Sequence, residues 1–227
     1  MGFKKALYSI YRCLLARPVR WLFFQNLIAH TDNFGHTMWM GQPIWQNVLD
    51  LWTIQETICE VKPELLIECG TNRGGSSLFY AHLFDLMNHG RIITIDVQKL
   101  HDLSHPRVTY LLGSSTAPDI VSTVKQAASE VKGPILVILD SDHSEAHVRR
   151  ELDCYASLVT PGSFCLVQDG VIDKLWMLSG DRPGPLPATR DFLKTHPEFV
   201  VDEERNNRFL ITHHPMGWLR RKPDTQA

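Results

Sequence analysis

Acidic or amide side chains end several short apolar runs in this sequence, and these positions are the candidates for chemistry. They are Glu68, Asp96, Asp140 and the pair Gln168-Asp169. If the runs are parallel strands, their carboxyl ends share one edge of a sheet, where ligands bind in open α/β folds. Scattered surface acids would not fall so regularly on strand ends. We therefore expect these side chains to meet in one site.

The segment 65–77 (LLIECGTNRGGSS) is typical of a strand, a glycine turn and a helix N-terminus. Glycine lets the backbone approach a ligand, and the free N–H groups of a helix start can bond it. The spacing is not the dinucleotide pattern G-x-G-x-x-G, and Glu68 before the first glycine would repel a pyrophosphate. A cofactor with an amino group and a ribose, such as S-adenosylmethionine, suits this carboxylate better. The alternative is an ordinary turn with a solvated glutamate.

Three acidic residues suggest distinct roles at this edge. Asp96 lies 26 residues after Gly70 and can accept hydrogen bonds from both ribose hydroxyls, or it caps a turn. Asp140 and Asp169 end strands whose ends can lie ~5 Å apart if the strands are neighbours. Two such carboxylates repel unless a cation or proton lies between them, so Mg²⁺ or Mn²⁺ is expected. The alternative is a pair of helix-capping aspartates, and Asp142 is a weaker ligand candidate for that reason.

Two histidines follow the fourth strand. His143, three residues after Asp140, is suited to be a general base beside a metal that acidifies a hydroxyl. His147 lies one helical turn further on and allows an i, i+4 zinc pair, but no third soft ligand is near in the sequence. The remaining histidines, including the pair His213-His214, are expected to face solvent.

Alternating strand and helix patterns indicate an α/β domain with a mainly parallel sheet and right-handed crossovers. A helix is predicted over 50–61, before the first strand. The strands are predicted over 64–68, 91–95, 108–112, 135–139, 164–167, 199–201 and 209–212. Later helices are predicted over 76–87, 118–131, 144–158 and 188–194.

Composition narrows the class of protein. The 227 residues are 44% apolar and 21% charged, as in a globular domain with a sizeable core. A net charge of −2 gives no drive toward nucleic acid. The five cysteines are scattered and odd in number, which favours a reducing cytoplasm. Two of them, Cys69 and Cys165, fall in or beside strands and are expected to be small buried hydrophobes.

Residues 1–30 are basic and amphipathic and contain no acidic residue. One or two helices broken at Pro18 are predicted, lying on an anionic membrane surface, on a second subunit or on their own domain. Arginines interrupt every apolar run, so the segment cannot span a bilayer and makes a poor signal peptide. The following loop, 31–47, carries Trp39, Met40 and Trp45 and is either a lid over a pocket or a core-packing connection.

At these residues the chain resembles the cephalosporin hydroxylase / rhamnosyl O-methyltransferase family. The matching runs include WMGQPIWQ, KPELLIECGTNRGGSS, ITIDV, LLGSS, VILDSDHSEAHVRREL, LVTPGSFCLVQDG and HHPMGWLRR, and they cover roughly residues 36–221. The resemblance implies a Rossmann-like class I methyltransferase fold with a mainly parallel seven-stranded sheet and helices on both faces. It also implies S-adenosylmethionine as cofactor and, as in several members, Mg²⁺-dependent methylation of sugar hydroxyls.

The family's functional residues carry over onto matching positions. The glycine turn (Glu68, Gly70, Asn72, Gly74, Gly75, Ser76) would hold the methionine part of the cofactor, Asp96 the ribose, and Ser114-Ser115 the adenine. Asp140, beside the cofactor, would hold the metal together with Gln168 and Asp169, and His143 resembles the proposed base. The departure is Gln168, where the family usually has glutamate. The amide has one negative charge less, so a weakened metal site or a metal-independent reaction is expected.

The sequence thus predicts a S-adenosylmethionine-dependent O-methyltransferase acting on a sugar of a glycan, glycolipid or secondary metabolite. Acceptor contacts are assigned to Trp39, Gln42 and Trp176, which could equally be packing residues. The rival predictions are a hydroxylase, although no 2-His-1-carboxylate spacing is evident, and a non-catalytic cofactor-binding subunit. The expected parts are an extension over 1–47, the methyltransferase domain over 48–221 and a tail over 222–227. The expected setting is the cytoplasm or the inner face of its membrane, with possible homo-oligomers.

Overall fold

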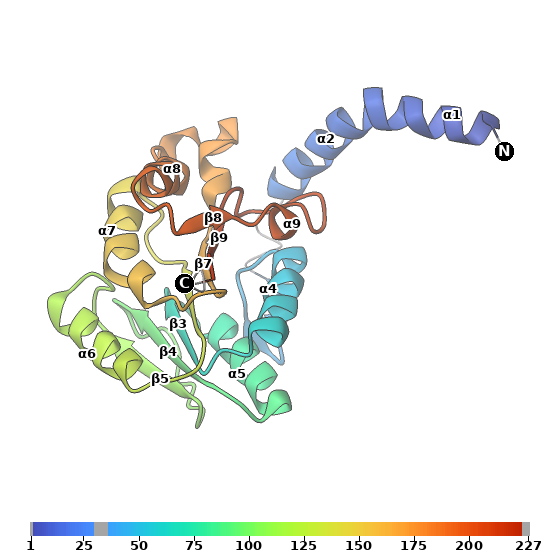
Figure 1. The fold of residues 1–227 in the computed structure, drawn as a ribbon. Helices are drawn as coiled ribbons and strands as arrows, with labels where there is room; N and C mark the ends of the chain where they lie inside the picture. Colours follow the sequence, from blue (N-terminus) through green and yellow to red (C-terminus); the bar gives the residue numbers. More distant parts are fainter. Residues whose placement is uncertain (1, 30–35, 224–227) are drawn as a thin grey trace.

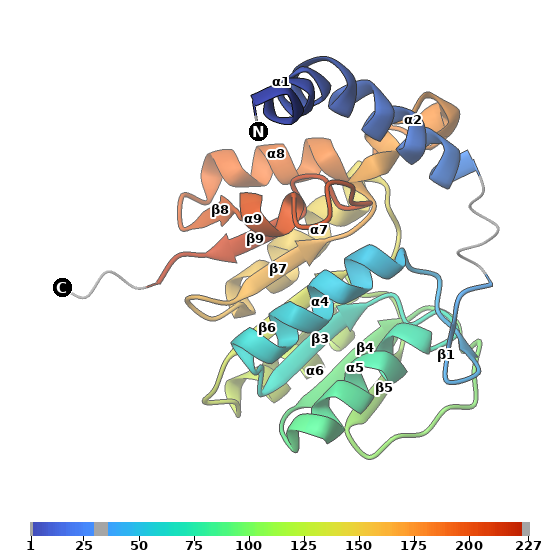
Figure 2. The same ribbon diagram turned by 90° about the vertical axis from the view of Figure 1, so that its right-hand side faces the viewer.

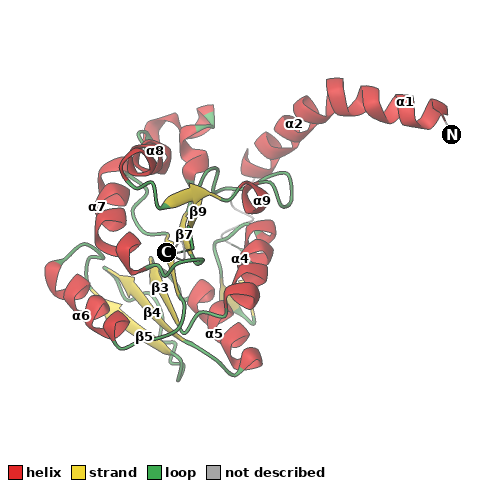
Figure 3. Cartoon of the chain, viewed as in Figure 1, coloured by secondary structure: helices red, strands yellow, loops and turns green. Residues whose placement is uncertain are grey.

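The computed structural model describes residues 2–29 and 36–223 and is built around a seven-stranded sheet of order β5-β4-β3-β6-β7-β9-β8 (Figures 1 and 3). Every neighbouring pair from β5 to β7 is parallel, whereas β9 is antiparallel to both β7 and β8. The strands are β3 (Leu65–Cys69), β4 (Arg91–Asp96), β5 (Val108–Leu112), β6 (Ile135–Leu139), β7 (Phe164–Val167), β8 (Phe199–Val201) and β9 (Trp218–Arg221). This is the predicted fold class.

Helices cover both faces of the sheet. On one face lie α4 (Val48–Val61) and α5 (Gly75–Met87), and on the other lie α6 (Pro118–Ser129), α7 (Glu145–Tyr155) and α8 (Pro185–Thr195) (Figure 1). Successive side chains of a strand point to opposite faces of the sheet, so each face has its own hydrophobic core. Leu65 and Ile67 pack with α6 and α7, and Leu66 packs with α4 and α5. All three side chains are fully buried, so both faces of the central strand are covered.

Shorter elements complete the chain. A two-stranded hairpin, β1 (Met38–Trp39) with β2 (Gln42–Pro43), precedes α4. Three 3₁₀ segments and one short helix connect the later strands: η2 (Ala156–Leu158), η3 (Gly170–Asp173), η4 (Trp176–Asp181) and α9 (Glu203–Asn206).

Most predicted elements are confirmed to within a few residues, but the last strand is wrong. Residues 209–212 form no strand, because Leu210 has a left-handed φ of 69° and the side chain of Asp50 binds the following residues. The strand that pairs with β7 and β8 is instead Trp218–Arg221, which lies within the expected domain 48–221 but for which no strand was predicted. Helix α8 also begins three residues early, at Pro185, since proline is favoured in a first helical turn.

The N-terminal helix is continuous rather than broken at Pro18. It comprises α1 (Gly2–Ile10), a π-helical turn η1 (Tyr11–Leu15) and α2 (Ala16–Ala29), and it extends away from the sheet (Figures 1 and 2). The N–H of Ala16 bonds the carbonyl of Tyr11, five residues back. This wider turn directly precedes Pro18, where the ordinary i+4 ladder would lack a donor. Among the described residues no helix combines the length and apolar content that crossing a membrane requires.

Candidate active site

A cavity of about 1170 Å³ lies at the carboxyl ends of the parallel strands. Strand register explains why: Cys69 aligns with Ile95 on one side and with Leu139 on the other, so the residues after them start at one edge. The predicted site residues that line the cavity are Gly70, Asn72, Gly75, Ser76, Asp96, Ser114, Ser115, Asp140, His143 and Asp169. Those that do not are Glu68, Gly74, Gln168, Trp39, Gln42 and Trp176.

The glycine turn is shaped by two close backbone approaches. Gly70 has a φ of +102°, and a Cβ there would lie 1.9 Å from the carbonyl oxygen of Asp140. A Cβ on Gly75 would lie 2.1 Å from the carbonyl oxygen of Pro43. Glycine is therefore required for the turn to fit between β6 and the segment after the hairpin.

Asp96 is fixed at the cavity edge by backbone donors. Its Oδ2 accepts from the N–H of Asn72 at 2.7 Å, and its Oδ1 accepts from the N–H of Gln98 at 2.9 Å. Each carboxylate oxygen can accept a further hydrogen bond. The predicted ribose contact is compatible with this orientation and stays a prediction.

Glu68 lies beneath the glycine turn rather than on the cavity wall. The carboxylate is fully buried and accepts from the Thr94 hydroxyl at 2.6 Å, while Thr94 is in turn bonded to Thr71 at 2.6 Å. Burial raises the pKa of Glu68 to about 7, although hydrogen bonds from Ser76 and Thr94 oppose the shift. Glu68 thus links β4 and the start of α5 below the turn.

Glu68→Gln should make stability less dependent on pH. A carboxyl whose folded pKa exceeds the unfolded one binds its proton more tightly when folded. The native protein therefore loses stability as the pH rises from about 4.5 to about 7. The loss is on the order of 3 kcal/mol. Urea unfolding at pH 5 and pH 8 should show the variant gaining on the wild type at the higher pH. Glu204→Gln, a change at an exposed position, is the control. If the free energy of unfolding of Glu68→Gln changes between pH 5 and pH 8 as much as that of the wild type, Glu68 does not have the raised pKa.

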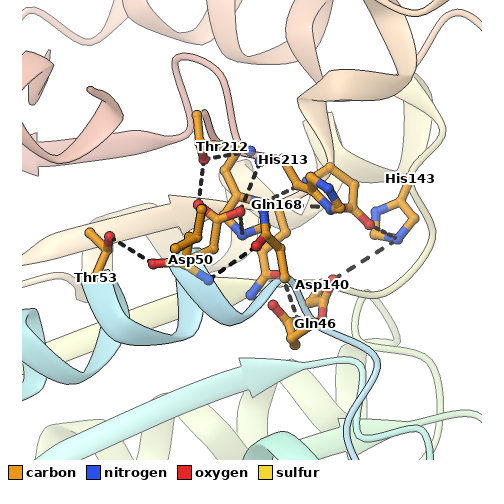
Figure 4. Close-up of polar contacts among 12 residues, drawn as sticks. Gln46, Asp50, Thr53, Asp140, His143, Gln168, Thr212 and His213 are labelled. Atoms are coloured by element: carbon orange, nitrogen blue, oxygen red, sulfur yellow. Dashed lines mark hydrogen bonds and ion pairs between the residues drawn. The ribbon is translucent and has the colours of Figure 1, made fainter. Parts of the chain in front are cut away.

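Asp140, His143 and Asp169 converge on one point at the cavity (Figure 4). One ligand atom from each lies within 4.8 Å of the others. His143 Nε2 is 3.3 Å from Asp169 Oδ2 and 4.0 Å from Asp140 Oδ1. Burial and then the charge of Asp169 raise the pKa of Asp140 well above its usual range. Burial would also raise the pKa of Asp169, but His143 and the His213-His214 pair outweigh it and lower that pKa.

Gln46 is a site residue that the sequence did not predict. Its side-chain amide donates to Asp140 Oδ2 and to Gln168 Oε1, each at 2.7 Å (Figure 4). Gln168 is 1% exposed. Its side-chain oxygen already accepts a hydrogen bond from Gln46. Gln46 falls inside the run WMGQPIWQ, and that match was the only signal that could have indicated it.

The paired histidines are not solvent-facing, which corrects the prediction. His213 lines the cavity, and His214 is 1% exposed. His214 Nδ1 accepts from the N–H of Asp169 at 3.1 Å, so its proton belongs on Nε2, 3.8 Å from Asp50 Oδ2. The hydrogen bonds that Asp50 accepts come from the Thr212 hydroxyl at 2.6 Å and from the N–H of His213 at 2.8 Å. This buried network joins Asp50 of α4 to Thr212 and His213 (Figure 4), and His214 in turn accepts from the backbone of Asp169.

His147 belongs to a different cluster, so the i, i+4 zinc pair is not formed. Its Nε2 lies 3.0 Å from the hydroxyl of Ser115 and 3.3 Å from Glu151. The hydrogen bond to Glu151 raises the pKa of His147 against the effect of burial. Glu151 is fully buried and also accepts from Ser115 at 2.5 Å and from Ser141 at 2.6 Å. The cluster orients the cavity wall near the predicted adenine position.

The three acceptor guesses lie elsewhere. Trp39 packs edge-on against Phe79 and donates to His82 at 3.0 Å, so it is a packing residue. Gln42 donates to the carbonyl of Arg73. Trp176 is exposed outside the cavity. Trp45, from the loop predicted to be a lid or a packing connection, does line the cavity. Lining residues that the sequence did not predict include Gln46, Leu178, Asp181 and His213.

The donor sets fit both predicted groups. The cavity is large enough for a nucleoside cofactor and part of an acceptor, since typical ligand pockets are about 300–1,000 Å³. For Mg²⁺, Asp140 and Asp169 offer hard oxygen ligands at the same point. Gln46 binds only one oxygen of Asp140, which leaves Oδ1 toward His143. A cation there would offset the repulsion that raises the pKa of Asp140.

Comparison with known proteins gives consistent results. The model of the family Rhamnosyl O-methyltransferase/CmcI matches residues 32–222. A rhamnosyl O-methyltransferase of Mycobacterium tuberculosis (strain H37Rv) is 33% identical over 84% of this chain and 82% of its own. That of Mycobacterium leprae is 31% identical over 88% and 87%.

Solved structures agree on the fold. The apo structure of CmcI has a TM-score of 0.64 at 18% identity and covers 83% of this chain and 77% of its own. The methyltransferase MycE of the mycinamycin pathway, in complex with Mg and SAH, has a TM-score of 0.53 at 17% identity over 81% and 51%. The structural likeness, the sequence relatives and the family match together show that this chain belongs to the rhamnosyl O-methyltransferase/CmcI family.

Proposed function

We propose that this protein is a S-adenosylmethionine-dependent O-methyltransferase whose acceptor is a sugar hydroxyl. The observation that carries the proposal is the meeting of Asp140, His143 and Asp169 beside the glycine turn in one cavity. The family match and relatives that are named rhamnosyl O-methyltransferases support both the reaction and a carbohydrate acceptor.

S-adenosylmethionine, when bound, supplies a methyl group on a positively charged sulfur, and Mg²⁺, when bound, supplies positive charge that acidifies a nearby hydroxyl. Asp140 and Asp169 would hold the metal, and Asp96 would orient the nucleoside. His143 Nε2 would accept the hydroxyl proton as the oxygen–carbon bond forms and the carbon–sulfur bond breaks. The residues of the cavity wall would hold the hydroxyl oxygen and the methyl group in line. The positive charge of the sulfur is lost in the transition state, so this positioning would supply most of the acceleration.

Gln168→Glu should tighten metal binding. The side-chain amide of Gln46 bridges Asp140 and Gln168. The substitution places a carboxylate at the far end of this bridge, and Gln46 can donate to it as it now donates to the Gln168 oxygen. Changes in such supporting partners alter metal affinity roughly 10- to 100-fold. Calorimetric titration with MgCl₂ alone should show the tighter constant. Gln126→Glu on α6 is the charge-matched control, and equal affinities for wild type and Gln168→Glu would contradict the role of this position.

Two rival functions predict different results. A hydroxylase would need a redox metal site, and the convergent group found among the described residues has one histidine and two carboxylates. A non-catalytic cofactor-binding subunit would bind the cofactor without turnover. The site retains Asp140, His143 and Asp169, which favours the enzyme.

We also propose cytoplasmic localisation with a glycan or small-molecule acceptor, and no nucleic-acid partner.

Methyl-labelled S-adenosylmethionine offered with a panel of rhamnosides, sugar nucleotides and glycolipids tests the proposal. Label that enters an alkali-stable product, and that is not incorporated when EDTA is present during the reaction, supports metal-assisted ether formation. Incorporation insensitive to EDTA would mean that His143 works without the metal. Cofactor binding without transfer to any sugar would favour the accessory subunit.

A further inference from the structure

The N-terminal helix exposes a large apolar surface that no other described part of the chain covers. Side chains that are between 43% and 67% exposed include Leu7, Tyr8, Ile10, Tyr11, Leu14, Leu15, Val19, Trp21, Leu22 and Phe23. Isolated apolar residues on a surface are ordinary, but a contiguous run of this size marks an interaction site. Figures 1 and 2 show this helix extending from the body along most of its length.

Within residues 2–29 and 36–223, the helix joins a hydrophobic cluster through its last turns alone. Phe24, Leu27 and Ile28 pack against Val171, Leu175 and Leu178 of the segments that follow β7. Ile28 is 3% exposed and also lines the cavity. The anchored end therefore lies at the cavity, and the exposed part of the helix extends away from it (Figure 1).

The charges of the helix identify its partner. Lys4, Lys5, Arg12, Arg17 and Arg20 are exposed, and residues 2–29 contain no acidic side chain. In α1 and η1 the apolar residues Leu7, Ile10 and Leu14 recur at helical spacing, while Lys5 and Arg12 lie two turns apart on another face. Basic residues beside an apolar stripe, with tyrosine and tryptophan between them, are typical of helices lying in an anionic membrane surface.

A second copy of the chain is a less suitable partner. Pairing this helix with its equivalent would bring the five cations of each copy together with no acidic residue to neutralise them. An anionic bilayer offers negative charge for the lysines and arginines of the helix and an apolar layer for its exposed apolar side chains. We propose that residues 2–23 lie in the interface of an anionic lipid bilayer and dock the protein there without crossing it. This inference concerns binding alone and does not depend on the proposed reaction.

Vesicle cosedimentation with the full-length protein, without cofactor, tests the inference. Wild type should bind vesicles of phosphatidylglycerol and phosphatidylcholine, and it should bind pure phosphatidylcholine at least tenfold more weakly. The double variant Lys5→Glu/Arg12→Glu should lose roughly tenfold or more of the binding to anionic vesicles. Lys125→Glu/Lys132→Glu makes the same charge change on the far side of the sheet and should bind like wild type.

The apolar face is tested separately with Leu7→Ser/Ile10→Ser/Leu14→Ser. These three residues are exposed and do not belong to the hydrophobic core, so the melting temperature should be unchanged while vesicle binding falls. Two results would overturn the inference. One is wild-type binding that is absent, or equal on neutral and anionic vesicles. The other is light scattering that shows the serine variant dissociating an oligomer while wild type binds no vesicle, which would make this helix a subunit interface.

Discussion

His143→Gln is expected to lower the rate of methyl transfer by about 10²- to 10⁴-fold while cofactor affinity stays within a few-fold of wild type. The range is that of a general base removed from its substrate. Glutamine retains a polar group beside Asp169, 3.3 Å from the present imidazole nitrogen, but it cannot accept the hydroxyl proton at neutral pH. Single-turnover rates with saturating S-adenosylmethionine measure the effect, and calorimetry measures the affinity.

The control for this substitution is His89→Gln, an exposed histidine whose ring bonds the carbonyl of Lys62 outside the cavity. It should leave the rate unchanged. If His143→Gln also turns over at the wild-type rate, His143 is not the base. If it abolishes cofactor binding, the residue holds the cofactor or the metal site rather than the proton.

Gly70→Ala is expected to abolish cofactor binding and to lower the melting temperature by several degrees. The added methyl group would lie 1.9 Å from the carbonyl oxygen of Asp140, so β3 and β6 would have to separate at the cavity edge. The left-handed φ of +102° adds strain for any residue with a side chain. Overpacking of this kind typically costs about 1–3 kcal/mol.

Gly162→Ala separates the two causes. Gly162 has a φ of +86°, but nothing lies within 4 Å of a Cβ placed there. It should show the strain of the φ angle alone and keep full cofactor affinity. Equal effects of the two substitutions on cofactor affinity would contradict the view that the turn depends on close packing against Asp140.

The parts of the site that could be predicted from sequence are those that follow from strand ends. Asp96 and Asp140 end or follow apolar runs, and parallel pairing brings such ends to one edge whatever the loops do. The glycine turn could be predicted because its steric requirement is local. The division into 1–47, 48–221 and 222–227 agrees with α4 starting at Val48 and remains a proposal. Residues 224–227 of the expected tail, 31–35 of the expected loop and residue 30 of the expected helical segment lie outside the described residues.

The parts that could not be predicted depend on contacts distant in the sequence. Gln46 bonds Asp140 across 94 residues, and Asp50 bonds His213 across 163. Without these contacts, residues 209–212 look like a strand and His213-His214 like a polar surface pair. Trp39, Gln42 and Trp176 do not line the cavity, and Trp39 packs against Phe79 and bonds His82 on α5. The acceptor contacts expected of these three residues stay predictions. Exposure of aromatic residues in a loop did not indicate which of them face the cavity.

Titration of the protein with S-adenosylmethionine in a calorimeter, with MgCl₂ and again with EDTA, tests the central claim most directly. We expect micromolar binding in both conditions, since the glycine turn and Asp96 would hold the cofactor without the metal. We also expect that Asp96→Ala weakens the binding at least tenfold, through the loss of charge-assisted hydrogen bonds. An absence of binding by the wild-type protein in both conditions would contradict the assignment of the cavity and, with it, the methyltransferase function.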